Sequence, residues 1–330
     1  MAGGHAICMT AIAPVLADLG LSLPTDLPFT VAQAKKRGVK PQKLALLAKL
    51  GVLRRLLHGV YVASEVPESI ELRCAALALV VPPDAFVCDT TAAWLYRGAT
   101  VLPPNAHLAV PPISCFRTGG KTRLRNSLTA SGERSVADGD VQEINGLQVT
   151  TELRTALDLG RLQPTRDMRL WGMDAMLSTE AFTPDELLAA VDRFARQRGV
   201  CMLRALAPLA DPLSQSFGES ALRLRWYDAG LPRPQLQIPI EVDGVEVAYL
   251  DMGLEDWLFA AEYDGEQWHS DDDDVEHDTA RRGWLRNQRR WWIDVFRKEH
   301  AFGHAQTAET RLRQAAAAAR ATYGTRTFIV

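Results

Sequence analysis

The residues best suited to chemistry are carboxylates at one end of an apolar hairpin. Its strands are predicted over Val245–Leu250 and Trp257–Tyr263, and Gly253 marks the turn between them. Asp251 ends the first strand, and Glu262 lies within the second. An uncompensated carboxylate in an apolar strand is costly, and a bound divalent cation is a common compensation. The sequence therefore predicts a cation site at this end of the hairpin.

Two further residues extend this candidate site. Asp264 follows Glu262 by two positions, so strand alternation places both carboxylates on one face, and His269 follows shortly after them. Carboxylate oxygens suit Mg²⁺ (or Mn²⁺), which activates water for hydrolysis. We therefore predict that Asp251, Glu262 and Asp264 bind the metal and that His269 acts as a general base or orients the leaving phosphate.

Each of these residues also has a simpler interpretation. Asp251 alone could be a turn residue, and Glu262 alone could pair with an arginine of the following helix. His269 stands beside Trp268 and an acidic run, where a structural histidine is the competing interpretation. The convergence of several acids favours the metal site over these separate explanations.

The net charge of −3 conceals two regions of opposite charge. Glu262–Asp278 contains nine acids and no Lys or Arg, which indicates metal ligation or a solvated acidic loop. Thr30–Tyr61 contains no acid, which indicates a polyanionic partner. Its eight basic residues are Lys35, Lys36, Arg37, Lys40, Lys43, Lys49, Arg54 and Arg55.

A short set of elements carries these basic residues. Helices are predicted over Phe29–Arg37 and Pro41–Leu50, the second with Pro at its first position and Gly51 just past its end. Short strands over Val52–Leu57 and Gly59–Val62 follow. This order is typical of a winged helix, in which the second helix enters the major groove of DNA and basic side chains contact phosphates. The alternative is a small helical domain whose lysines only solvate its surface.

The middle of the chain offers no catalytic constellation. Residues 67–210 are predicted as a mixed α/β domain that is largely helical toward its end, with a hairpin over Val141–Val149. Ile113–Arg125 is predicted as a loop carrying a second basic cluster. Arg154 and Asp158 stand at helical spacing and could pair.

Residues 211–330 alternate between helices and strands. The predicted order is α-β-β-β-α-β-α, with the hairpin supplying the second and third strands. The other elements are predicted over Ser216–Asp228, Gln235–Ile240, Val275–Arg289, Trp291–Phe296 and Thr307–Ala321.

This order, with acids at these places, resembles the restriction-endonuclease-like (PD-(D/E)XK) fold, and within it the branch of DUF559 proteins and very-short-patch-repair endonucleases. The residues that carry the resemblance are Glu219, the turn Asp228–Pro234, Asp251, Glu262–Gly265 and His269. The resemblance implies that Asp251 and Glu262 hold a divalent cation. It also implies that Glu219, on the leading helix, adds a ligand or positions a water.

One residue departs from the general pattern of that superfamily. The pattern has Lys two positions after the second acid, where this chain has Asp264. The DUF559-like branch resembles this chain in having Asp there. The role of stabilising negative charge then passes to the metal and to His269 or Arg281.

Thr30–Tyr61 resembles the N-terminal winged helix of AbiEi-type antitoxin and regulator proteins. The likeness rests on Gln33-Ala34, Gly51, Leu53–Arg55 and His58–Tyr61. By the same resemblance, we interpret residues 67–210 as an AbiEi-like middle domain.

We therefore predict a multidomain α/β (α+β) protein with four segments. These are a lead-in segment (1–28), a winged helix (29–66), a mixed α/β middle domain (67–210) and a restriction-endonuclease-like domain (211–330). The function predicted is that of a DNA-binding, Mg²⁺-dependent deoxyribonuclease. The alternative is a non-enzymatic AbiEi-like regulator or antitoxin with a degenerate nuclease-like domain, and a third interpretation is an RNA-directed nuclease.

The partner expected is duplex DNA, and a protein partner or a homodimer is left open. The five cysteines are scattered and never CxxC-spaced, which fits a reducing cytoplasm rather than a disulfide framework or a zinc knuckle. No apolar run is long enough to span a bilayer, so no membrane association is expected.

Overall fold

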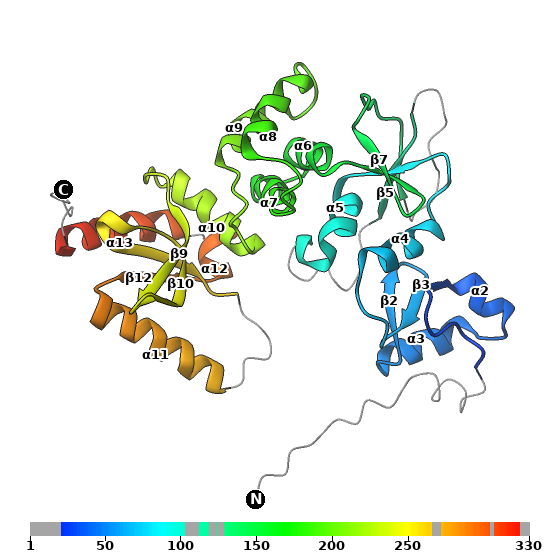
Figure 1. Cartoon of the computed structure of the whole chain (residues 1–330), viewed down its shortest axis with the longest axis horizontal. Coiled ribbons are helices and arrows are strands. Elements are labelled where there is room, and N and C mark those ends of the chain that lie inside the picture. The colour runs from blue at the N-terminus through cyan, green and yellow to red at the C-terminus, as the bar shows by residue number, and fades with distance from the viewer. Residues whose placement is uncertain are drawn as a thin grey trace, which may run out of the picture. The chain divides into compact units, whose positions relative to one another are not determined.

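The computed structural model describes residues 21–102, 112–118, 124, 129–265, 272–303 and 307–323. The chain divides into two compact units, Met1–Thr155 (the first unit) and Ala156–Val330 (the second unit). Helices and sheets occur in both, so the chain is an α+β multidomain protein, as the sequence predicted (Figure 1). Within the described ranges, no helix is both long and apolar enough to cross a membrane.

The first unit contains the predicted order of two helices and two strands, but Phe29–Thr30, predicted as the start of the first helix, forms a short additional strand before it. A three-stranded sheet has the order β1-β3-β2, and all of its strand pairs are antiparallel. The elements are β1 (Phe29–Thr30), α2 (Val31–Lys36), α3 (Pro41–Lys49), β2 (Leu53–Leu57) and β3 (Val60–Ala63).

Local sequence explains where these two helices begin. The Thr30 hydroxyl accepts a hydrogen bond from the Gln33 N–H, and the Gln33 side chain accepts one from the Thr30 N–H, which forms a capping box for α2. Pro41 starts α3, where its missing N–H costs nothing. Leu44 and Leu47, on one face of α3, are completely buried against the core of the winged helix. The opposite face of α3 is therefore left to solvent.

The rest of the first unit is built on a five-stranded sheet with the order β6-β5-β4-β8-β7. Its elements are α4 (Ile70–Ala78), β4 (Phe86–Val87), α5 (Asp89–Arg97), η1 (Gly98–Val101), β5 (Ile113–Phe116), β6 (Thr129–Ala130), β7 (Val141–Ile144) and β8 (Leu147–Thr150). The β7–β8 hairpin is as predicted, and its Asn145 and Gly146 both have positive φ, as a type I′ turn requires.

One sequence prediction in this region was wrong. Ile113–Phe116 was assigned to a loop, but it is strand β5, which lies between β4 and β6. Its first three side chains are buried, because the strand lies inside the sheet rather than at its edge. A run of only four residues, followed by a Gly-rich basic segment, gave too short a pattern to separate strand from loop.

The boundary between the two units falls inside α6 (Glu152–Leu162). Arg154, in the first turn, donates to Asp140 Oδ2 over 2.6 Å, and both side chains are buried. Asp158, in the next turn, accepts a hydrogen bond from Arg161 Nη2 over 2.9 Å. The sequence suggested that Arg154 could pair with Asp158. It did not indicate the contacts of Arg154 with Asp140 and of Asp158 with Arg161.

The second unit continues with helices and then a four-stranded sheet. Its helical part comprises α7 (Arg166–Leu177), α8 (Pro184–Ala190), η3 (Val191–Phe194), α9 (Val200–Leu206) and η4 (Ala207–Leu209). The part that follows comprises α10 (Phe217–Asp228), β9 (Gln235–Val242), β10 (Val245–Leu254), η5 (Glu255–Trp257), β11 (Phe259–Tyr263), α11 (Asp272–Arg289), β12 (Trp292–Phe296), α12 (Lys298–Ala301) and α13 (Ala308–Tyr323).

The last part confirms the predicted element order, with the short helix α12 added before α13. The sheet order is β12-β11-β10-β9, with β11 and β12 parallel and the other pairs antiparallel. The two strands of the hairpin differ in length from the prediction. β10 runs on to Leu254, so Asp251 lies within the strand rather than at its end, and η5 displaces the start of β11 to Phe259.

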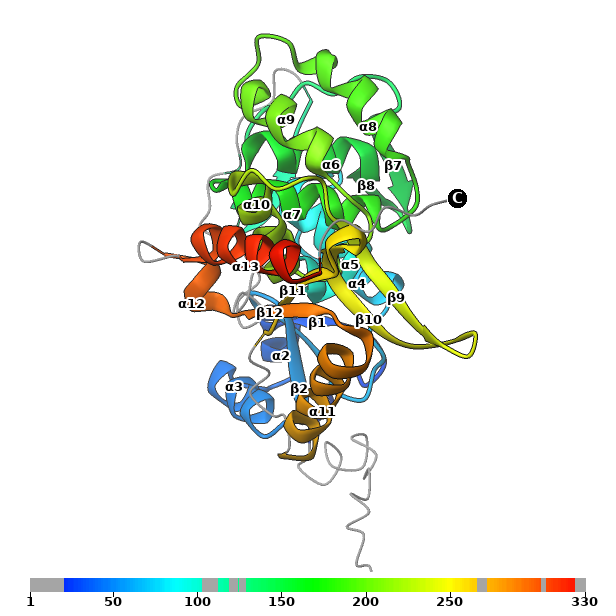
Figure 2. The same ribbon diagram turned by 90° about the vertical axis from the view of Figure 1, so that its left-hand side faces the viewer.

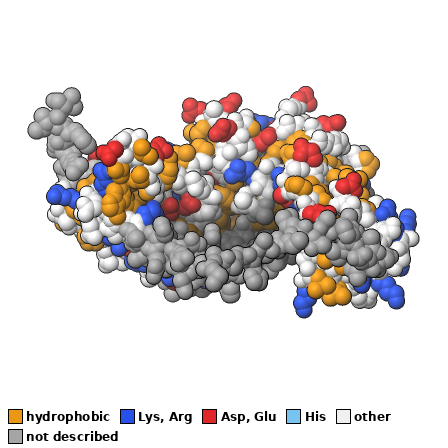
Figure 3. Space-filling view, turned by 60° about the horizontal axis from the view of Figure 1, so that its bottom comes forward, with side chains coloured by type: hydrophobic (Ala, Val, Ile, Leu, Met, Phe, Trp, Pro, Cys, Tyr) orange, Lys and Arg blue, Asp and Glu red, His pale blue; other side chains and the backbone are white. Residues whose placement is uncertain are grey.

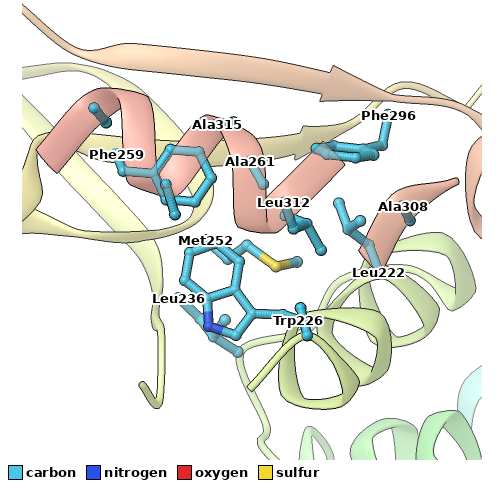
Figure 4. Packing of buried hydrophobic residues seen from close by; sticks show 13 residues of the cluster. Leu222, Trp226, Leu236, Met252, Phe259, Ala261, Phe296, Ala308, Leu312 and Ala315 are labelled. Carbon is cyan, nitrogen blue, oxygen red and sulfur yellow. The ribbon is translucent and has the colours of Figure 1, made fainter. Parts of the chain in front are cut away.

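Helices cover both faces of this sheet. Figure 2 shows α13 and α11 on opposite sides of it. Trp226 of α10, Phe259 of β11 and Leu312 of α13 are buried in one hydrophobic cluster, and the rings of Trp226 and Phe259 are stacked 5.2 Å apart (Figure 4). On the other face, Leu285 of α11 is buried with Leu250 and neighbouring strand residues. The sheet is therefore a central layer, and both of its faces are buried against helices.

The junction between the helical part of the second unit and α10 is a buried polar contact. Asp174 of α7 forms an ion pair with Arg223 of α10, and both side chains are at most 1% exposed. Asp174 also accepts hydrogen bonds from the Ser220 hydroxyl over 2.5 Å and the Asp211 N–H over 2.8 Å. Arg225, two residues further along α10, pairs with Asp167 of α7. The predicted boundary near residue 210 thus lies within tightly packed structure.

Candidate nucleic-acid interface and carboxylate cluster

The winged helix presents a basic surface. Six of its eight predicted DNA-contacting side chains are exposed and a seventh, Lys43, is half-buried. Among the described residues none of these seven has a carboxylate partner, so their charges are available to an anion. The exposed six are Lys35, Lys36, Arg37, Lys40, Lys49 and Arg55.

Arg54 differs from the other seven. It forms an ion pair with Glu68, and its guanidinium also donates to the Val66 carbonyl over 2.6 Å. Its side chain is about one-third exposed. Arg54 therefore ties β2 to the segment after β3, and its predicted phosphate contact would compete with Glu68.

The wing has a compact arrangement of its own. Gly59 has a φ of +76°, which turns the chain between β2 and β3. Arg55 Nη2 lies 2.5 Å from His58 Nδ1 and Nε donates weakly to the Leu57 carbonyl, so the guanidinium is held at the base of the turn. Arg55 remains exposed there, which leaves it free to reach a phosphate.

Apart from Lys49, the solvent face of α3 carries residues that the sequence analysis did not single out. We call this stripe the exposed face of α3; it consists of Gln42, Ala45, Leu46, Lys49 and Leu50. Leu46 is 47% exposed and Leu50 is 66% exposed, whereas Leu44 and Leu47 behind them are buried. The spacing i, i+3, i+4, i+7 of the stripe could have revealed it from sequence. Figure 3 shows basic side chains around a hydrophobic patch over the winged helix, at the lower right.

The second unit brings three of the predicted catalytic carboxylates near one another. We call Glu219 of α10, Asp251 of β10 and Glu262 of β11 the carboxylate cluster. Gly218 allows this approach, because a Cβ at that position would lie 2.0 Å from the ring of Tyr263 on β11. Glu219 accepts hydrogen bonds from the Gln215 N–H over 2.9 Å and the Gln237 side chain over 3.2 Å.

Burial perturbs the acids of this cluster. The pKa of Asp251 rises to about 7, first because burial disfavours its charge and then because of repulsion from Glu219; the Tyr263 N–H, which donates to it over 2.8 Å, opposes the rise. Repulsion from Glu262 adds a smaller rise. Burial also raises the pKa of Glu219, against its hydrogen bonds from Gln215, Ser216 and Gln237. A raised carboxylate pKa is typical of functional sites, although structural networks produce it too.

Two arginines of α11 form ion pairs with Glu262, the third acid of the carboxylate cluster. Glu262 is buried, and it accepts a hydrogen bond from Arg282 Nε over 2.7 Å and from Arg281 Nη2 at 3.2 and 3.3 Å. The simpler interpretation of Glu262, pairing with the following helix, therefore describes this structure. Two guanidinium groups stand where a cation ligated by Glu262 would carry its charge.

Asp264 was also predicted to belong to the site. Asp264 pairs with Arg297 over 3.2 Å and is partly exposed. His269 lies outside the described residues. No group of three potential ligands with metal-binding geometry is present in the part of the chain that the structure describes. In this arrangement the carboxylates do not fit a divalent cation, because Glu262 and Asp264 are already neutralised by arginines.

Part of the first unit and part of the second match a known protein family. The family of AbiEi antitoxin C-terminal domains matches residues 85–209, which run from just before β4 to the end of η4. This supports the AbiEi-like part of the resemblance seen in the sequence.

Two relatives from Mycobacterium tuberculosis align over more of the chain. They are the uncharacterized protein MT2308 of strain CDC 1551 / Oshkosh and the uncharacterized protein Rv2248 of strain ATCC 25618 / H37Rv. Each is 32% identical over 254 residues, which is 77% of this chain and 88% of the relative. The chain belongs to the same family as these two mycobacterial proteins, and within it residues 85–209 are similar to the AbiEi antitoxin C-terminal domain.

Proposed function

We propose that the protein is a DNA-binding regulator of the antitoxin type, which binds duplex DNA through its winged helix. The observation that carries the proposal is the surface of α2, α3 and the wing, where seven basic side chains have no carboxylate partner among the described residues. The similarity of residues 85–209 to an antitoxin domain supports it.

The proposed binding mode follows from the shape of the winged helix. α3 enters the major groove with its exposed face toward the bases, and Lys40 and Lys49, near its two ends, contact phosphates on either side. Arg55 on the wing contacts the backbone nearby. Lys35, Lys36 and Arg37 at the end of α2 add sequence-independent attraction.

Binding of labelled duplexes by the full chain tests this proposal. Lys40 and Lys49 are exposed, so they can be replaced without disturbing the buried core of the winged helix. The Lys40→Glu/Lys49→Glu variant should lose roughly tenfold or more in affinity, since two phosphate contacts become repulsive. Arg196→Glu/Arg198→Glu, two exposed arginines of the second unit, is the control with the same change in charge. Equal losses in both variants, or no duplex binding by the wild-type chain, would exclude the winged helix as the DNA-binding element.

A metal-dependent deoxyribonuclease is our second candidate function. The specific observation that favours it is the cluster of Glu219, Asp251 and Glu262 on a sheet with the α-β-β-β-α-β-α order. For a cation to bind, Glu262 would first have to leave Arg281 and Arg282, so any cutting activity should depend on movement of α11.

Plasmid nicking by the purified full chain tests this second candidate. Reactions with Mg²⁺ or Mn²⁺ are compared with EDTA, beside Asp251→Asn and Glu262→Gln. A nuclease at this site should cut only with metal and should lose its activity in both variants. Cutting that survives both substitutions would place the activity elsewhere or in a contaminant, and no cutting at all would leave the regulator as the function.

A further inference from the structure

The exposed face of α3 combines exposed apolar side chains with basic ones. Leu46 and Leu50 are among the most exposed large hydrophobic side chains of the described residues. A single exposed leucine is ordinary, but these two lie one turn apart on the helix proposed to enter DNA. Lys40 and Lys49 carry positive charge on the same helix, and Thr30–Tyr61 contains no acid. The face is therefore apolar in its middle and basic around it.

This combination restricts what can cover the face. A partner must offer negative charge around an apolar centre. The major groove of duplex DNA does so, because phosphates line its edges and the C5-methyl group of thymine is the apolar group on its floor. Gln42, at the N-terminal end of the stripe, adds an amide, which can bond to adenine N6 and N7 in bidentate fashion.

The length of the face fits a short base sequence. Leu50 lies eight positions after Gln42, so the stripe extends about 12 Å along the helix axis. Base pairs stack about 3.4 Å apart, so the stripe covers about three of them. Its non-basic side chains are suited to A·T pairs, because none of them offers the positive bidentate donor that typically reads guanine.

We propose that α3 selects A·T base pairs, with Leu46 in contact with a thymine methyl group and Gln42 bonded to adenine. This inference rests on the proposed DNA-binding function and deepens it by naming the bases read. Leu50, at the C-cap, extends the apolar contact toward the neighbouring base pair. Lys40 and Lys49 hold the helix in register through phosphates and contribute no base preference.

Replacement of thymine by uracil isolates the methyl group and so tests the proposal. The full chain first selects duplexes from a random-sequence pool, and each thymine of the selected duplex is then replaced in turn by uracil. We expect at least one thymine at which uracil weakens wild-type binding about fourfold, the effect of one buried methyl group. At that position Leu46→Ala should bind both duplexes equally well.

Two matched variants separate this contact from general effects. Lys49→Ala should weaken binding of both duplexes by the same factor and keep the thymine preference. Leu188→Ala, which shortens a leucine of α8 that is 42% exposed, should leave affinity and preference unchanged. Circular dichroism checks that Leu46→Ala, a surface change, retains the native helix content.

The possible outcomes separate the selection of A·T pairs by α3 from the proposed DNA-binding function. Failure of the wild-type chain to bind any duplex would overturn the DNA-binding function together with the inference, whereas binding without enrichment of any sequence would overturn only the inference. Enrichment of a duplex that is insensitive to uracil, or thymine preference that persists in Leu46→Ala, would overturn only the assignment of α3 as an A·T reader. A selected sequence rich in G·C pairs under α3 would overturn it as well.

Discussion

Asp251 shows how one residue can couple the carboxylate cluster to pH. Its ordinary pKa of 3.8 rises to about 7, because its half-buried position disfavours the charged form and because it lies near Glu219. The folded chain thus holds a proton that the unfolded chain releases. The contribution of this protonated carboxyl to the free energy of unfolding is fully present below about pH 4. It is lost as the pH rises through about 7.

Asp251→Asn removes this titration and so should remove its pH dependence. The asparagine can still accept the hydrogen bond of the Tyr263 N–H, which makes the change nearly isosteric. Between about pH 4 and about pH 7, the free energy of unfolding of the wild type should fall relative to the variant by up to about 1.4 kcal/mol per pH unit. Above that range the difference should be constant. Urea unfolding followed by tryptophan fluorescence measures it.

Tryptophan fluorescence is suited to this measurement, because seven of the eight tryptophans lie after residue 155 and so report on the second unit. Asp256→Asn, which removes the same charge at an exposed position of η5, serves as the control. A wild type whose stability follows that of Asp251→Asn at every pH would mean that Asp251 titrates normally in the folded chain.

At the scale of elements, the pairing of α7 with α10 depends on a buried ion pair. Asp174→Asn would leave the guanidinium of Arg223 buried opposite a neutral group. We expect the second unit to lose about 3–5 kcal/mol of unfolding free energy, since a buried charge without its partner is strongly destabilising. The double change Asp174→Leu/Arg223→Met should recover much of this loss, because an apolar pair of similar volume needs no charge compensation.

An exposed ion pair of the same unit provides the comparison. Arg204 and Asp192 lie 2.9 Å apart with side chains 48% and 85% exposed, so Asp192→Asn should cost less than about 1 kcal/mol. Both variants are compared by urea unfolding at one pH. If Asp174→Asn cost no more than Asp192→Asn, the ion pair would not hold α7 against α10.

The elements themselves were largely predictable, because their signals are local. Pro41 and Gly51 bracket α3, and Asn145-Gly146 specifies the β7–β8 turn. The element order α-β-β-β-α-β-α also follows from periodicity along residues 211–330. Ile113–Phe116 was missed because a strand of four residues carries too little pattern to distinguish it from a loop.

The partners of charged side chains were much less predictable. Glu262 meets Arg281 and Arg282 only because α11 folds back across the sheet, and Asp174 meets Arg223 across a sequence separation of 49 residues. A single sequence shows that an acid is buried but does not show which cation faces it. The winged-helix lysines are different, since the absence of any acid from Thr30–Tyr61 leaves few local partners to consider.

At the scale of the whole molecule, net charge and local charge oppose each other. The chain carries −3 overall, so on average it is repelled by DNA, while the winged helix gathers seven basic groups that have no carboxylate partner among the described residues. Attraction then comes from a small surface, and each phosphate contact releases counterions. If four to seven of these groups contact phosphates, a plot of log affinity against log salt concentration should have a slope of about −4 to −6 per copy bound.

Fluorescence anisotropy of a labelled duplex at increasing NaCl measures this slope. Lys40→Glu/Lys49→Glu should make it shallower by about two, because two phosphate contacts are lost. Leu46→Ala should leave it unchanged, since a contact to a base methyl group releases no counterions, even if affinity falls. A slope near zero would show that the basic surface does not face phosphates. An unchanged slope in the lysine variant would move the contacts away from α3 and toward the end of α2.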